Sequence, residues 1–269
     1  MHRAARFFEM KRLGQPIAVL TAYDYPTAKA EAEAGIDLIL VGDSLGTNVL
    51  GYASERQVTL ADIAHHLRAV RRGAPQTPIL ADLPFGQYET PAAAIVNARE
   101  LVEAGADMVK FEGARPEIVA ALKEAGILCC GHLGLEPQHH EDRRLKGRSV
   151  EEAKKLLADA IALDKAGISL LVLELVPEEV AEQITRALGV PTIGIGAGRL
   201  TDGQVLVIND VLGITQADFR HSRRFADFGR LTGEALKGYI GEVRERRFPA
   251  GENVFHMGDD ELRAFGGRS

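Results

Sequence analysis

The sequence predicts a single α/β domain folded as a (β/α)8 barrel, also called a TIM barrel, and three observations favour it. Apolar runs of strand length alternate with helical stretches along nearly the whole chain, as in βα units around a parallel sheet. Four of these runs stop on an acidic residue. The chain has 269 residues, a length at which single α/β barrels are common. About eight such units favour a closed barrel over an open sheet.

The composition argues against several classes of protein. The chain is 46% hydrophobic with a net charge of −6, and it lacks a long basic block, so we expect no nucleic-acid partner. No apolar run approaches the roughly 18 residues of a membrane span, and the charged N-terminus is unlike a signal peptide. Cys129 and Cys130 are adjacent and should point to opposite faces of a strand, which suits two buried thiols in a reducing cytoplasm.

The elements follow one another without a linker, so we expect one domain over residues 1–269. We expect a strand at 17–21, a helix at 24–34, a strand at 37–41, a glycine-containing loop at 42–57 and a helix from Thr59 to about Gly73. Further strands are expected near 78–81, 107–111, 127–131, 169–173 and 192–195, with helical stretches between them. Residues 205–210 either complete an eighth strand or open a helix, and a last helix lies near 230–246. From about Ala250 we expect the tail to fray or to pack on a neighbouring subunit.

A weak internal repeat marks three of the helical stretches. Gly35, Gly105 and Gly167 each follow an alanine at the end of such a stretch, as expected for a left-handed helix stop. An apolar strand and then an acid follow each glycine. Because the carboxyl ends of parallel strands meet at one end of a barrel, the acids that end strands should gather there. These acids are Asp43, Asp82, Glu112 and Glu174.

Two aspartates follow the second and third expected strands. Asp43, in VGDSLG, places a carboxylate beside the hydroxyl of Ser44. It could instead cap a helix, but the next expected helix begins only at about Thr59. Asp82, in LADLPFG, is followed by Leu-Pro, which keeps the chain from running straight into a helix. A surface-turn aspartate is the alternative for Asp82.

Charged residues also end two later strands. Lys110 and Glu112 are two apart and share a face, while Val109 and Phe111 face the helices. A lysine and a glutamate inside a barrel are costly unless they pair or bind a ligand, so a structural ion pair is the alternative to a site. Glu174, in LVLELVP, is expected in apolar surroundings that suit a general base. Its alternative role is a carboxylate bonded to backbone at the barrel mouth.

Weaker signals come from histidines and glycines. His132, in CCGHLG, either contacts substrate or metal or is a hydrogen-bonded histidine at the rim. The pairs His65-His66 and His139-His140 are expected on the surface and lack zinc spacing. The segment GIGAG at 194–198 resembles a phosphate-binding loop but has neither the dinucleotide spacing nor a P-loop lysine. Close approach of backbone or ligand explains this segment equally well.

Several carboxylates without a matching histidine and cysteine set indicate a hard cation. Magnesium prefers oxygen ligands and keeps water, which leaves positions for a chelating substrate such as a 2-oxo acid. The metal would stabilise the enolate formed when a carbon acid loses its proton. With Glu174 as base and Lys110 as cation, the residues predict an enolate-forming site.

Seven motifs together resemble the ketopantoate hydroxymethyltransferase family, in the same order over about residues 7–257. They are LTAYDYPTA (20–28), ILVGDSLG (39–46), ILADLPFG (79–86), VKFEGA (109–114), GHLGLEPQ (131–138), LLVLELVP (170–177) and GIGAGRLTDGQVLV (194–207). The resemblance implies a magnesium-dependent barrel related to the phosphoenolpyruvate mutase and isocitrate lyase group. It implies transfer of a hydroxymethyl group from 5,10-methylenetetrahydrofolate to 3-methyl-2-oxobutanoate, giving 2-dehydropantoate, the committed step toward pantothenate and coenzyme A. It also implies a large homo-oligomer, commonly a decamer.

The resemblance further implies roles for individual residues. One magnesium ion per subunit would be held by Asp43, Asp82 and Glu112. The oxo acid would be held at Asp43, Ser44, Asp82 and Lys110. Glu174 matches the proton acceptor, and His132 matches a family histidine without an assigned role.

Two loops depart from the family pattern. After GHLGL the chain reads EPQHHEDRRLKGR, where the family usually has TPQ and then a stretch containing Gly-Gly-Tyr before Gly-Arg. GTNVLGYASE at 46–55 lacks the usual Met after the glycine and the Asp after Gly-Tyr. We expect both loops around the barrel mouth, so they bear on folate contacts and loop closure.

Two other functions stay open from the sequence. A carbon–carbon lyase of the same superfamily would use the same enolate chemistry in the cleavage direction, but the Lys-Lys-Cys-Gly-His loop usual in those lyases is absent. A barrel kept as a binding or assembly protein has only the atypical loops in its favour. Clustered buried charge argues against it.

Overall fold

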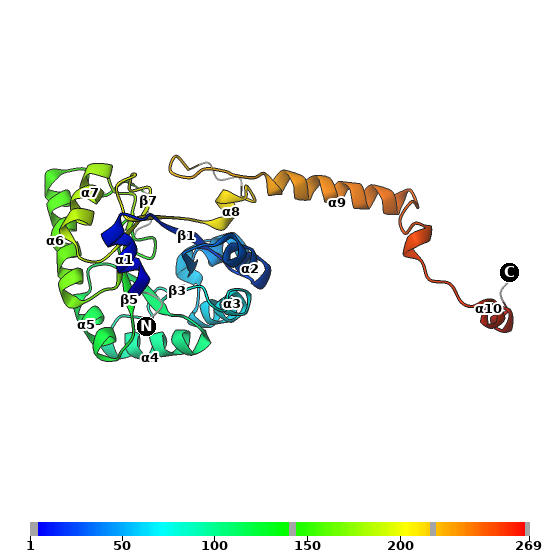
Figure 1. Cartoon of the computed structure of the whole chain (residues 1–269), viewed down its shortest axis with the longest axis horizontal. Coiled ribbons are helices and arrows are strands. Elements are labelled where there is room, and N and C mark those ends of the chain that lie inside the picture. The colour runs from blue at the N-terminus through cyan, green and yellow to red at the C-terminus, as the bar shows by residue number, and fades with distance from the viewer. Residues whose placement is uncertain (1–4, 140–143, 216–218, 267–269) are drawn as a thin grey trace.

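Eight parallel strands close into a barrel in the computed structural model, which describes residues 5–139, 144–215 and 219–266 (Figure 1). The strands are β1 (Ile17–Thr21), β2 (Leu38–Val41), β3 (Ile79–Asp82), β4 (Met108–Glu112), β5 (Cys129–Gly134), β6 (Leu170–Glu174), β7 (Thr192–Ile195) and β8 (Gly203–Leu206). Each strand pairs with the next along the chain, and β8 pairs with β1. The predicted (β/α)8 barrel is therefore confirmed.

Helices alternate with the strands around the outside of the barrel (Figure 1). These helices are α1 (Ala5–Leu13), α2 (Tyr25–Ala34), α3 (Leu60–Gly73), α4 (Pro91–Ala104), α5 (Pro116–Glu124), α6 (Val150–Ala166), α7 (Glu178–Ala187) and α8 (Ile208–Val211). Two further helices, α9 (Phe228–Arg244) and α10 (Asp259–Phe265), follow them in the chain. The segment 205–210 contains both of the elements predicted as alternatives there: β8 ends at Leu206, and a helix, α8, begins at Ile208.

The glycine-containing loop at 42–57 is more regular than expected. It contains a π-helical turn at Gly46–Leu50 and a 3-10 turn at Glu55–Gln57. A helical turn thus starts well before Thr59, yet Asp43 does not cap it with its side chain, which bonds elsewhere.

Local sequence sets the ends of the helices. The Asp24 carboxylate caps α2 by accepting from the Thr27 backbone N–H at 2.8 Å, and Thr59 caps α3 in a reciprocal pair with Asp62. Gly35 and Gly167 end α2 and α6 with φ of 84° and 107°, which a residue with a Cβ adopts only with strain. The predicted helix, glycine stop and strand repeat is confirmed.

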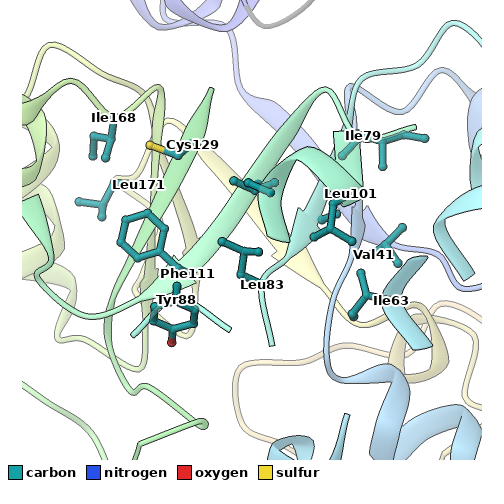
Figure 2. Packing of buried hydrophobic residues seen from close by; sticks show 14 of the residues in the cluster. Val41, Ile63, Ile79, Leu83, Tyr88, Leu101, Phe111, Cys129, Ile168 and Leu171 are labelled. Atoms are coloured by element: carbon teal, nitrogen blue, oxygen red, sulfur yellow. The ribbon is translucent and has the colours of Figure 1, made fainter. Parts of the chain in front are cut away.

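Alternation along each strand builds two cores. Side chains facing the helices form the larger one, in which Phe111 and Leu171 lie near Tyr88 and Leu83 (Figure 2). Side chains facing inward form a second core, which Phe7 of α1 joins with no exposed surface. Cys129 belongs to the outer core and Cys130 to the inner one, and both are free thiols, as predicted.

From α9 onward the chain projects away from the barrel (Figure 1). α9 has no buried residue, and even its apolar residues Leu236, Tyr239 and Ile240 are exposed. A 3-10 turn at Gly251–Asn253 and α10 follow at the far end, also without buried residues. Among the described helices, none combines the length and apolar character that a membrane crossing requires.

Candidate active site

The four acids predicted to gather do lie at one end of the barrel. Asp82, Glu112 and Glu174 are the last residues of β3, β4 and β6, and Asp43 follows β2 by two positions. All four line a single cavity of about 540 Å³. Ser44, Lys110 and His132 line the same cavity. The structure therefore brings together every residue that the sequence proposed for the site.

Lys110 and Asp82 form a buried ion pair beneath the cavity. The Lys110 Nζ lies 2.9 Å from Asp82 Oδ1, and the two residues are 4% and 2% exposed. Burial alone would lower the pKa of Lys110, but the charges of Asp82, Asp43 and Glu112 outweigh it and raise that pKa. Lys110 is therefore a permanent cation at the base of the cavity.

Asp43 lies next to this pair. Its backbone N–H donates to Asp82 Oδ2 at 3.0 Å. Burial and then the charge of Asp82 raise the pKa of the Asp43 carboxyl well above its ordinary value, while Lys110 acts in the opposite direction. The local balance is three buried acids against one lysine, so a further positive charge would stabilise the ionised acids.

The carboxylates of Asp43, Asp82 and Glu112 are oxygen donors of the kind that a magnesium ion prefers. Within the described part of the chain, no three His, Cys, Asp or Glu side chains converge into a ready metal cluster. Magnesium keeps several waters and is commonly bound through one or two carboxylates, so a closed protein cage is not required. The buried Asp82 Oδ1 has no hydrogen-bond partner besides its ion pair, and the acids outnumber the lysine. These residues fit a hydrated hard cation.

His132 lies between two of the acids. Its Nε2 is 3.2 Å from Glu174 Oε2, and its Nδ1 is 3.6 Å from Glu112 Oε1. The expectation that Glu174 has apolar surroundings is therefore wrong, because the neighbouring strand β5 places an imidazole against it. Glu174 also keeps 19% of its side chain exposed, toward the cavity. Its carboxylate therefore faces the cavity.

The backbone turns sharply just after Glu174. Leu175 has a φ of 46°, in the left-handed region that costs a branched residue free energy. Its N–H donates to the Ile195 carbonyl, and its carbonyl accepts from the Lys146 N–H. These two hydrogen bonds hold the turn that ends β6 and directs Glu174 into the barrel mouth.

Sequence reasoning missed several polar residues at the site. Gln138 is fully buried and bonds to two of the acids, and the Tyr23 hydroxyl lies 2.8 Å from Ser44 Oγ. His139 is exposed, as predicted, although its Nδ1 lies 3.4 Å from Glu112 Oε2. His66 is partly buried, and its Nδ1 lies 2.6 Å from the Tyr23 carbonyl oxygen. The available signal for Gln138 was its place at the end of GHLGLEPQ, after a strand that opens into the mouth.

The glycine segment at 194–198 is explained by close packing. A Cβ added at Gly198, whose φ is 80°, would lie 2.5 Å from the Glu178 Cβ. The next N–H, from Arg199, already donates to Glu178 Oε2 at 2.7 Å. A carboxylate of the protein thus takes this donor, and the close approach of Glu178 explains the glycine at position 198.

The atypical loops do reach the barrel mouth. Thr47, Asn48 and Glu55 of the first loop line the cavity. Pro137 lines it from the start of the second loop. His140 and the rest of 140–143 lie outside the described residues.

Comparison with known proteins assigns the family. The family model described as ketopantoate hydroxymethyltransferase matches residues 2–251. The chain belongs to the ketopantoate hydroxymethyltransferase family. A relative from Ignicoccus hospitalis named 3-methyl-2-oxobutanoate hydroxymethyltransferase is 49% identical over 90% of this chain and 94% of its own. One of the same name from Thermus thermophilus is 48% identical over 95% and 100%.

Solved structures share the fold of this family member at low sequence identity. A 2,3-dimethylmalate lyase, titled a member of the PEP mutase/isocitrate lyase superfamily, has a TM-score of 0.60 and 16% identity, covering 99% of this chain and 98% of its own. A phosphonopyruvate hydrolase solved with oxalate and magnesium has a TM-score of 0.62 and 10% identity, covering 98% of each chain. These likenesses support the barrel architecture alone.

Proposed function

We propose that this family member transfers a hydroxymethyl group from 5,10-methylenetetrahydrofolate to 3-methyl-2-oxobutanoate, giving 2-dehydropantoate. The observation that carries the proposal is the cavity that joins three buried acids, one buried lysine and the more exposed Glu174. Relatives that share nearly half of its residues over almost their whole length bear the name of this activity. Such a reaction would supply the pathway to pantothenate and coenzyme A.

In this proposal the buried charges bind the anionic oxo acid. Lys110 offers a permanent positive charge to its carboxylate or carbonyl oxygen, and Ser44 offers a hydroxyl held by Tyr23 at 2.8 Å. Asp43, Asp82 and Glu112 would hold one magnesium ion. When bound, that ion would supply the charge that stabilises an enolate.

Glu174 is the proposed proton acceptor. It would take the proton from C3 of the oxo acid, leaving an enolate whose oxygen faces Lys110. His132 lies beside this carboxylate, with its Nε2 3.2 Å from Glu174 Oε2, and does not need to touch substrate. The sharp turn at Leu175 fixes the position of Glu174.

The carbon–carbon bond then forms between C3 and the methylene carbon of the folate. That carbon is bonded to two folate nitrogens, and both bonds break: one as the carbon–carbon bond forms and the other as water supplies the hydroxyl oxygen. The two nitrogens take up the proton removed from C3 and one proton of the water, and tetrahydrofolate leaves. The cavity volume of about 540 Å³ accommodates more than the small oxo acid. Its outer wall includes Asn48, Asp210 and Thr215, which offer polar groups to the second substrate.

We also propose that the protein works as a homo-oligomer, of ten copies, in the cytoplasm. The exposed apolar residues of α9, which projects from the barrel, need cover from another surface (Figure 1). A second copy of the chain would provide it. Two buried free thiols suit a reducing compartment.

The activity is tested by following 2-dehydropantoate formation from purified protein. Product should require the oxo acid, methylenetetrahydrofolate and a divalent cation together. A carbon–carbon lyase would instead cleave a longer acid without folate. Cleavage activity and no folate-dependent product would overturn the proposal.

A further inference from the structure

A buried amide links two of the acids proposed to hold the metal. Gln138 follows β5 and has no exposed surface. Its Nε2 donates to Asp43 Oδ2 at 2.7 Å. Its backbone N–H donates to Glu112 Oε2 at 2.9 Å. One residue thus contacts a carboxylate from the end of β2 and another from the end of β4.

The surroundings fix the orientation of this amide. Besides Asp43, Nε2 donates to the Leu83 carbonyl at 3.1 Å. A carboxylate and a carbonyl only accept hydrogen bonds, so the NH2 group must face both of them. On the other side, the Tyr88 hydroxyl donates to Gln138 Oε1 at 2.5 Å. A flipped amide would turn its oxygen toward two groups that can only accept, and both of those hydrogen bonds would be lost.

Tyr88 is itself held in place. It is 1% exposed, and its ring lies 5.7 Å from that of Phe111 in the outer core (Figure 2). The Glu112 N–H approaches its hydroxyl at 3.4 Å. The amide of Gln138 is therefore anchored to the barrel wall.

These hydrogen bonds use one oxygen of each acid and leave the other. Oδ2 of Asp43 and Oε2 of Glu112 both face Gln138. Oδ1 of Asp43 and Oε1 of Glu112 take no part in these two bonds, and Oε1 lies 3.6 Å from His132 Nδ1. Hydrogen bonds to the outer oxygen of a ligating carboxylate set its orientation and its affinity for metal.

We infer that Gln138 is a positioning residue that holds Asp43 and Glu112 in the orientation that binds a divalent cation. This inference rests on the magnesium site of the proposed function. It also links that site to the atypical loop, because Gln138 is carried at the start of EPQHHEDRRLKGR.

The test is a titration of the full chain with Mn²⁺, in which electron paramagnetic resonance measures free Mn²⁺ and no substrate is present. Gln138→Leu removes the side-chain donor, and we expect its Mn²⁺ dissociation constant to rise about 10–100-fold. Tyr88→Phe is the matched control, because it disturbs the same buried network and leaves both donors of Gln138 to the acids. We expect the control to change the constant by less than about threefold.

The thermal midpoint of each metal-free variant separates the site from the fold. A purely structural role would lower the midpoint and leave Mn²⁺ affinity unchanged. If Gln138→Leu fails to fold, Gln138→Met, with an unbranched side chain of similar length, replaces it with the same expectation.

Three results would overturn the inference. Equal Mn²⁺ affinity in wild type and Gln138 variants would remove Gln138 from the role and leave the proposed function intact. Equal weakening in Tyr88→Phe would show that the effect passes through packing. No Mn²⁺ binding by wild type would remove the proposed metal site and this inference with it.

Discussion

The carboxyl group of Glu31 is buried without a partner, and this has a measurable cost. Glu31 lies on the inner face of α2 and is 5% exposed, and neither of its oxygens has a hydrogen-bond partner among the described residues. Burial, and then the negative charge of Asp24, raise the pKa of Glu31 from 4.5 to about 8. Ala28, one turn earlier on α2, packs near Gly73 of α3, so the burial of this face is part of the barrel's outer layer.

The sign of the effect follows from proton linkage. Between pH 4.5 and about 8 the folded protein keeps a proton on Glu31 that the unfolded chain has released. The free energy of unfolding therefore falls as pH rises through this window, by up to about 1.4 kcal/mol per pH unit. Over the whole window the loss approaches ~5 kcal/mol, and below pH 4.5 this contribution to stability is complete.

The perturbation is Glu31→Gln, which removes the titrating group. We expect urea unfolding at pH 5, 6, 7 and 8, at one fixed protein concentration, to show a shallower fall in the variant than in wild type. The buried amide costs about 1–3 kcal/mol at every pH and does not alter the slope. Glu33→Gln, at an exposed position of the same helix, should keep the wild-type slope. Parallel pH profiles for wild type and Glu31→Gln would refute the reasoning.

Three further predictions concern the site and the C-terminal arm. Glu174→Gln should lower turnover by about 10²–10⁴-fold and leave oxo-acid binding unchanged, whereas Glu179→Gln, at an exposed position, should leave turnover unchanged. Steady-state kinetics measure turnover and calorimetry measures oxo-acid binding; near-normal turnover in Glu174→Gln would remove Glu174 from its role. Lys110→Met leaves Asp82 buried without its cation and should lower metal-free stability by about 3–5 kcal/mol, measured by urea unfolding, with part regained on adding magnesium; an unchanged stability would contradict the ion pair. Ile240→Glu on α9 should yield smaller assemblies in light scattering, while Lys237→Glu should not, and an unchanged mass would count against α9 as an interface.

The barrel and its acids could be predicted because the signals are local. A strand that is buried on both faces reads as an apolar run, and an acid at its end marks where the barrel opens. The alternation that placed Lys110 inward and Phe111 outward is a property of any strand. For this reason the gathering of Asp43, Asp82, Glu112 and Glu174 was visible without coordinates.

The partners of those acids could not be predicted, because they are set by contacts across the fold. Gln138 reaches Asp43 over 95 positions of sequence, and His132 meets Glu174 only because β5 pairs with β6. His139 is exposed, as its sequence suggests, but nothing near it in the sequence reveals its contact with Glu112. Sequence periodicity predicts on which face of a strand or helix a residue lies. The residues that its side chain contacts depend on neighbouring strands and loops, which are distant in sequence.

Proton exchange at C3 of 3-methyl-2-oxobutanoate tests the central claim most directly. The substrate is incubated with the protein in heavy water, with and without magnesium and before any folate is added, and exchange is followed by NMR. The account predicts magnesium-dependent exchange in wild type that is lost in Glu174→Gln. Absence of exchange in wild type, even with magnesium and tetrahydrofolate both present, would contradict enolate formation at this site.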